Sequence, residues 1–150
     1  MRKAKSQKQN RGPQQEKQVG AKKVGVVNYP VGDFLIRLKN ASLARKQTFS
    51  LSNTGLISAV AKTLKNEGFL EEVSEKEKRL FVRIAYKKKE PVMLGLRLVS
   101  KPGIRIYMGI DNIQELKGPS IFILSTPKGV MSSREAIKRR LGGEIIAEVF

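Results

Sequence analysis

Apolar residues change from helical to strand spacing along this chain, and that change restricts its fold class more than any other feature. In YPVGDFLIRLKNASLARK, Val31, Phe34, Leu35, Leu38 and Leu43 keep near-helical spacing, and basic residues take the other side. TFSLS then alternates as a half-buried strand does, and TGLISAVAKTLKNEG returns to the helical pattern before a glycine ends it. Because helices and strands follow each other within a short stretch, the sequence predicts an α+β fold.

Strand patterns dominate the rest of the chain. FLEEVSE and RLFVRIAYK predict a hairpin around KEK at 76–78, and Ser52 or Asn53 is predicted to cap the helix before it. Further on, PVMLGLRLVS, the end of KPGIRIYMG, SIFILS and EIIAEVF predict strands, NIQELK a helical turn and SSREAIKRR a capped short helix. We therefore predict two small α+β subdomains packed together, at residues 24–90 and 91–150.

The first 23 residues have a different composition. They carry eight Lys or Arg and only Glu16 as an acid, with scarcely an apolar side chain before Val19. Such a segment buries too little surface to offset the entropy of ordering it, so residues 1–23 are predicted to be a disordered basic tail. They lack both the apolar core of a secretory signal and the amphipathic Arg/Ser pattern of a transit peptide.

Charge and missing residue types restrict the function. The 30 Lys and Arg against 13 Asp and Glu leave a net charge of +17, and residues 24–150 alone, with 22 basic and 12 acidic side chains, carry +10. A polyanionic partner is favoured, nucleic acid before an anionic membrane surface, and no apolar run approaches the roughly 18 residues of a membrane-spanning helix. Without cysteine or histidine, the chain lacks thiol nucleophiles, imidazole bases and the usual zinc ligands. We predict a protein that is not an enzyme and needs no metal or organic cofactor.

The stretch ILSTPKGVM ends a strand in a tight polar turn. By itself STPKG is typical of a plain turn, because hydroxyl residues, proline and glycine form turns for local reasons. Its alternative is an RNA contact. The hydroxyls of Ser125 and Thr126 suit 2′-hydroxyls and base edges, Lys128 offers a charge to a phosphate, and Gly129 permits close backbone approach.

Two other basic stretches can likewise be interpreted either as purely structural or as RNA contacts. SKPGIRIY is explained as a turn by its Pro-Gly, but Lys101 and Arg105 could hold phosphates and Tyr107 could stack on RNA or lie in the core. REAIKRR places Arg134 and Lys138 on one helical face, which suits a nucleic-acid backbone. The KKK run at 87–89 is more typical of a solvated loop. Charge alone does not separate RNA from DNA.

Five stretches in register resemble a known family. STPKGVM, SKPGIRIY and LGGEIIAEVF, preceded by PVGDFLIRLKNA and LKNEGFLEE, look like the signatures of the bacterial-type small-subunit ribosomal protein eight family. The resemblance covers about residues 28–150. It implies a cytoplasmic protein on the ribosome that binds the central domain of small-subunit rRNA, assists its folding and subunit assembly, and contacts neighbouring small-subunit proteins.

The resemblance also implies which residues lie at the RNA. The family's hydroxyl-rich loop meets an irregular RNA stem, and the aromatic after the Pro-Gly turn and the Gly-Gly-Glu before the last strand lie nearby. These features correspond here to Ser125, Thr126, Lys128, Gly129, Tyr107, Gly143 and Glu144. A carboxylate such as that of Glu144 can accept a hydrogen bond from a base amino group or orient a neighbouring donor.

This sequence departs from the family pattern in three places. Pro127 stands where a third hydroxyl is common, SNTGLIS replaces a lysine-bearing stretch near the second helix, and the basic tail is an addition. An alternative function for the same chain is a translational repressor that binds a stem of its own messenger RNA. A nucleic-acid enzyme ranks third, because metal-dependent cleavage requires clustered carboxylates and the acids here are scattered.

Overall fold

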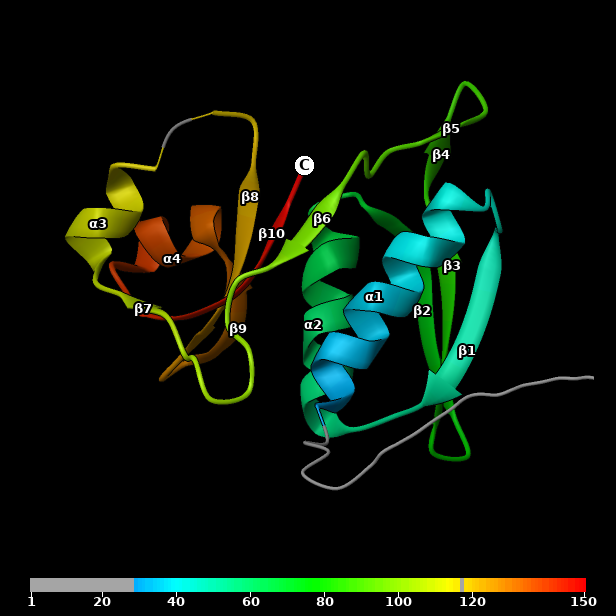
Figure 1. Ribbon diagram of the computed structural model, residues 1–150, viewed down its shortest axis with the longest axis horizontal. Coiled ribbons are helices and arrows are strands. Elements are labelled where there is room, and N and C mark those ends of the chain that lie inside the picture. The colour runs from blue at the N-terminus through cyan, green and yellow to red at the C-terminus, as the bar shows by residue number, and fades with distance from the viewer. Residues whose placement is uncertain (1–28, 117) are drawn as a thin grey trace, which may run out of the picture.

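The structure is a computed structural model that describes residues 29–116 and 118–150, as helices and antiparallel sheets (Figure 1). The predicted α+β class is confirmed. The first half runs α1 (Pro30–Leu43), β1 (Thr48–Ser52), α2 (Gly55–Asn66), β2 (Leu70–Lys76) and β3 (Arg79–Ile84). Its strands form an antiparallel sheet in the order β1-β3-β2, with both helices on one side of it (Figure 1). The predicted basic tail lies outside the described residues.

Local sequence signals set the ends of these elements, but the predicted cap of α2 was wrong. Thr54, rather than Ser52 or Asn53, caps α2, because its side-chain oxygen accepts a hydrogen bond from the backbone N–H of Ile57. The Asn53 backbone N–H donates instead to the carbonyl of Lys78 in the neighbouring turn. The predicted hairpin is confirmed, with β2 and β3 joined at Glu77 and Lys78, both of which have positive φ.

A short ribbon and one strand lead into the second half. β4 (Tyr86–Lys87) pairs with β5 (Glu90–Pro91), and the KKK run lies exposed at this turn, as predicted. The strand predicted from PVMLGLRLVS is shorter than expected, because only β6 (Leu96–Leu98) pairs with the C-terminal strand.

The second half is built around the C-terminal strand. It comprises β7 (Tyr107–Met108), α3 (Ile110–Gln114), β8 (Ile121–Thr126), β9 (Gly129–Ser132), α4 (Ser133–Arg139) and β10 (Gly143–Val149). The sheet order is β6-β10-β8-β9, and β7 also pairs with β10. The strand β9 extends what the sequence predicted only as a turn, and α3 begins two residues before NIQELK. The predicted cap of α4 is confirmed, because the Ser132 hydroxyl accepts a hydrogen bond from the Glu135 N–H.

The hydrophobic core joins the two halves. Its larger cluster combines side chains of α1, α2 and the first sheet with Ile123 and Val149 of the second sheet. A smaller cluster under α3 and α4 contains Ile113, Leu124, Met131, Ala136 and Ile145. The two halves are therefore held together by a continuous apolar cluster, and the subdomain boundary at residue 90 stays a prediction. Among the described residues, no helix is both long and apolar enough to cross a membrane.

Candidate nucleic-acid interface

Three strand ends bring together site residues that lie far apart in the sequence. Tyr107 of β7 pairs with Glu144 of β10, and Glu144 pairs on its other side with Ser125 of β8. Directly opposed residues of an antiparallel pair share one face, with their Cβ atoms about 4.5–5.5 Å apart. Tyr107, Glu144 and Ser125 therefore form a single cross-strand row, which we call the C-terminal row.

Glycine is required where β10 enters this row. A Cβ atom on Gly143 would lie 2.2 Å from the carbonyl oxygen of Ser125, and one on Gly142 would lie 2.6 Å from that of Met108. Both distances are far below van der Waals contact with backbone atoms. The Gly-Gly step thus lets β10 pass between β7 and β8, which gives Gly143 a structural role in placing Glu144 beside Ser125.

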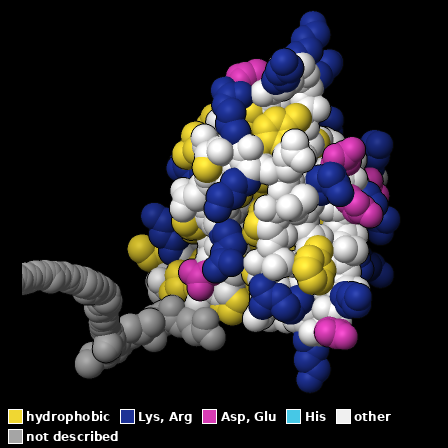
Figure 2. Space-filling view, turned by 90° about the vertical axis from the view of Figure 1, so that its right-hand side faces the viewer, with side chains coloured by type: hydrophobic (Ala, Val, Ile, Leu, Met, Phe, Trp, Pro, Cys, Tyr) yellow, Lys and Arg dark blue, Asp and Glu magenta, His cyan; other side chains and the backbone are white. Residues whose placement is uncertain are grey.

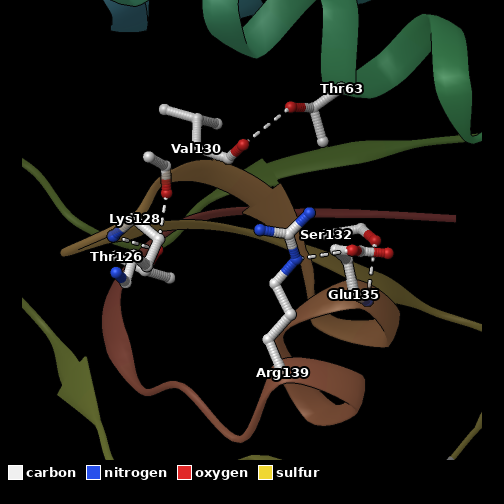
Figure 3. A network of polar contacts seen from close by, with 8 residues as sticks. Thr63, Thr126, Lys128, Val130, Ser132, Glu135 and Arg139 are labelled. Carbon is white, nitrogen blue, oxygen red and sulfur yellow. Dashed lines mark hydrogen bonds and ion pairs between the residues drawn. The ribbon is translucent and has the colours of Figure 1, made fainter.

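Thr126 is buried within the β8–β9 turn, so its hydroxyl, which the sequence suggested as an RNA contact, is engaged inside the protein. Its hydroxyl donates to the carbonyl of Gly129 at 2.7 Å and accepts from the N–H of Lys128 at 3.1 Å, as Figure 3 shows. Gly129 has φ +114°, a conformation that favours glycine. The Thr126 hydroxyl therefore shapes the turn, and Pro127 and Lys128 are exposed at its tip.

This arrangement predicts a stability loss for Thr126→Val. The substitution leaves the Lys128 N–H and the Gly129 carbonyl without their partner, so we expect a fall of about 1–3 kcal/mol in the free energy of unfolding. Urea unfolding measures it. Ser125→Ala is the matched control, since it removes the neighbouring hydroxyl of the same strand from a less buried position, and an equal loss in both variants would contradict the assignment.

Glu144 and Arg105 form an ion pair beside the row. Arg105 Nη1 lies 3.0 Å from Glu144 Oε2, and this hydrogen bond and charge raise the pKa of Arg105, which stays cationic. The guanidinium also lies 5.6 Å from the ring centroid of Tyr29. Burial raises the pKa of Tyr29, whose hydroxyl donates to the carbonyl of Ser100. Glu144 therefore already has a partner, and the arrangement lets it orient the Arg105 guanidinium.

The remaining predicted residues differ in whether they lie close to the C-terminal row. Tyr107 is 70% exposed, which excludes the core position that the sequence left open. Lys101 is exposed where its backbone bonds reciprocally with Ile104, and this loop and the β8–β9 turn lie along the same edge in Figure 1. Arg134 lies elsewhere, 3.6 Å from Glu67 at the end of α2. The structure thus gathers the predicted residues around the row, except Arg134.

A second surface lies behind the β8–β9 hairpin. A groove of about 330 Å³ runs between α2 and α4 and includes Lys128, Arg139 and Thr63 in its lining. The Thr63 hydroxyl lies 3.4 Å from the carbonyl of Val130, and Arg139 is held by Glu135 at 2.7 Å (Figure 3). The Thr63–Val130 contact joins the back of the β8–β9 hairpin to the first half of the chain, whereas the Arg139–Glu135 pair lies within α4.

Sequence reasoning missed Tyr29 and Thr63. The Tyr29 hydroxyl reaches a residue 71 positions away, and Thr63 reaches one 67 positions away, so no local pattern could reveal either contact. Gly142 did carry a signal, because adjacent glycines before a strand suggest close backbone approach. Among the described residues, no group of three or more acidic side chains is placed to hold a metal ion.

Comparison with known proteins decides the family. The family model described as ribosomal protein S8 matches residues 29–150, which is most of the chain. The chain belongs to the ribosomal protein S8 family. A relative from Chloroflexus aurantiacus named small ribosomal subunit protein uS8 is 39% identical over 131 residues, covering 83% of this chain and 98% of its own. The protein of the same name from Nitratidesulfovibrio vulgaris (strain Miyazaki F) is 38% identical over 122 residues, covering 81% of this chain and 97% of its own.

Family membership confirms the predicted protein class and the predicted location. The protein is a structural component of the small ribosomal subunit, and its place is on the ribosome in the cytoplasm. The family is structural and not enzymatic, in agreement with the predicted class. The family match begins at Tyr29, so the basic tail precedes the matched region.

Proposed function

We propose that this protein binds small-subunit rRNA directly, on its central domain, and assists the folding of that RNA and the assembly of the subunit. The C-terminal row supports this most, because it joins an exposed aromatic ring, a hydroxyl and a carboxylate that holds the Arg105 guanidinium beside them. The binding surface consists of the row itself with Arg105, Lys101 and Lys128, which we call the C-terminal interface. Family membership supplies the ribosomal context, with rRNA and neighbouring small-subunit proteins as partners.

Each group of the C-terminal interface has a distinct part in the proposed contact. The ring of Tyr107 stacks on an exposed base, and the Ser125 hydroxyl pairs with a 2′-hydroxyl or a base edge. Lys101 and Lys128 contact phosphates at the two neighbouring loops. Arg105, held by Glu144, presents its remaining N–H groups to the RNA. Thr126, Gly129 and Gly143 act indirectly, by setting the backbone that carries these groups.

Binding is expected to prefer a structured RNA stem to the same sequence as DNA. The reason is that a hydroxyl donor and an exposed ring recognise 2′-hydroxyls and irregular grooves, which duplex DNA lacks. A competition assay at physiological salt, with an irregular central-domain rRNA stem as the labelled ligand, measures the preference. Equal affinity for the duplex DNA would contradict the proposal.

Ser125→Ala is expected to weaken binding of the specific stem without a comparable effect on stability. The loss is about 1–3 kcal/mol if the RNA group that meets the hydroxyl is left unpaired. Titration of the stem into wild-type and variant protein measures it, and urea unfolding provides the stability control. Unchanged stem affinity would show that this hydroxyl lies outside the interface.

The second proposed function is translational repression through a stem in the protein's own messenger RNA. The C-terminal interface is compatible with this function, because hydroxyls and an aromatic ring recognise the shape of an irregular stem. Any RNA that contains such a stem, including a messenger RNA, would be recognised in the same way. Co-sedimentation with small subunits, followed by sequencing of crosslinked RNA, separates the two functions. Crosslinks to rRNA alone would remove the repressor function.

A further inference from the structure

The first sheet has one covered and one open face. Alternate residues of β3 point inward and are buried, namely Leu80, Val82 and Ile84. The intervening residues Arg79, Phe81 and Arg83 point away from the helices and are exposed. No described element covers this outer face, which is therefore a candidate for a contact with another molecule.

Cross-strand register arranges the outer face in three rows. The central row is Ser50, Phe81 and Ser74, from β1, β3 and β2 in turn. On one side of it lies the row Ser52, Arg79 and Lys76, and on the other the row Thr48, Arg83 and Glu72. An aromatic ring thus stands at the middle of the sheet, with a serine on either side of it and a basic row next to it.

Phe81 is unusual for its position. It is 42% exposed, although an aromatic ring on a central strand is ordinarily covered, and its alternating neighbours on β3 are almost completely buried. A depression of about 770 Å³ lies over the ring and the side chains around it. An exposed ring in a shallow depression, flanked by hydroxyls, suits stacking against a flat polar ring better than it suits burial in an apolar interface.

The charges around Phe81 favour an anionic partner. The acids near this face already have partners. Glu72 and Glu71 lie 3.7 Å and 4.0 Å from Arg83 Nε, and Glu75, at the edge of the depression, pairs with Lys62 at 3.1 Å. Arg79 and Lys76 form a basic row on the other side of Phe81. Arg79 donates from Nη2 to the Ser50 hydroxyl at 3.0 Å, which holds the guanidinium against the central row. Figure 2, which views this side of the molecule, shows Lys and Arg widely spread and the fewer acids toward the margins.

We propose that the outer face of the first sheet is a second RNA-binding surface that takes a single-stranded segment. One unpaired base stacks on Phe81, and Arg79 and Lys76, about 7 Å along the strands, hold phosphates of the same segment. Ser50 and Ser74 offer hydroxyls to the base edge or to the sugar. This surface lies outside the C-terminal interface and goes beyond the function proposed there, so either can be disproved without the other.

Tryptophan fluorescence tests the surface directly, because the natural chain contains no tryptophan. Phe81→Trp in the full-length protein places the only indole on the outer face and preserves an aromatic ring. Titration with a ten-nucleotide oligoadenylate should quench this fluorescence to saturation. Leu94→Trp is the matched control at an exposed apolar position on another segment, and it should be quenched much less.

Affinity measurements with the same oligonucleotide complete the test. Phe81→Ala should weaken oligoadenylate binding by about fivefold to hundredfold, whereas Phe81→Trp should retain it. Every variant keeps the basic tail, so nonspecific attraction is constant, and the central-domain stem titrated in parallel reports the C-terminal interface separately. The proposal fails if Phe81→Ala binds oligoadenylate like wild type, or if both indoles respond equally.

Discussion

Gly143→Ala is expected to lower the free energy of unfolding by about 3 kcal/mol, at the upper end of the usual range for overpacking. The added Cβ would meet the Ser125 carbonyl oxygen at 2.2 Å and its carbonyl carbon at 2.9 Å. Both are backbone atoms, so no side-chain rotation relieves the contact and β10 must move away from β8. The same movement separates Glu144 from Ser125, so binding of the specific rRNA stem should weaken as well.

Gly109→Ala is the matched control for this substitution. Gly109 has φ −80° and ψ 169°, which alanine adopts without strain, and a Cβ there would meet no atom within 4 Å. Urea unfolding and stem titration on both variants measure the two effects. A Gly143→Ala protein as stable as the Gly109→Ala protein would show that β10 and β8 tolerate separation at this point.

Removal of residues 1–23 is expected to reduce nonspecific RNA affinity strongly and to leave the preference for the specific stem intact. The segment carries eight basic and one acidic side chain, so its removal changes the net charge by seven. Each phosphate that the shortened protein no longer neutralises lowers the magnitude of the slope of log K against log salt by about 0.7–0.9. If only some of the eight basic side chains of the tail neutralise phosphates, its removal still changes this slope by several units. Affinities for the specific stem and an unrelated RNA over a salt series measure both effects.

A full-length variant separates the charge of the tail from its length. Replacing its eight Lys and Arg with Gln keeps the chain length and should reproduce the effect of truncation. If truncation abolishes the preference for the specific stem at every salt concentration, the tail itself reads the RNA. The proposed assignment of specificity to the C-terminal interface would then be wrong.

Local patterns were sufficient for the elements of the first half. The apolar spacing around Phe34 and Leu64, the alternation around Leu80 and the stop at Gly68 each depend on neighbouring residues. Such signals arise because helix and strand periods place apolar side chains on one face. They failed where the competing contact was distant, as at Asn53, whose backbone N–H bonds to Lys78 while Thr54 caps the helix.

The sequence by itself determined the fold class, the family resemblance and the residues proposed to meet RNA, because motifs and periodicity are written in short stretches of chain. Only the tertiary structure decided how those residues act. It placed Tyr107, Glu144 and Ser125 in one row, bound Arg105 to Glu144, buried the Thr126 hydroxyl in its own turn and left Phe81 exposed on the outer face. The physical reason is register: which strands pair, and which residue faces which, depends on packing between segments tens of residues apart, and no local signal records it.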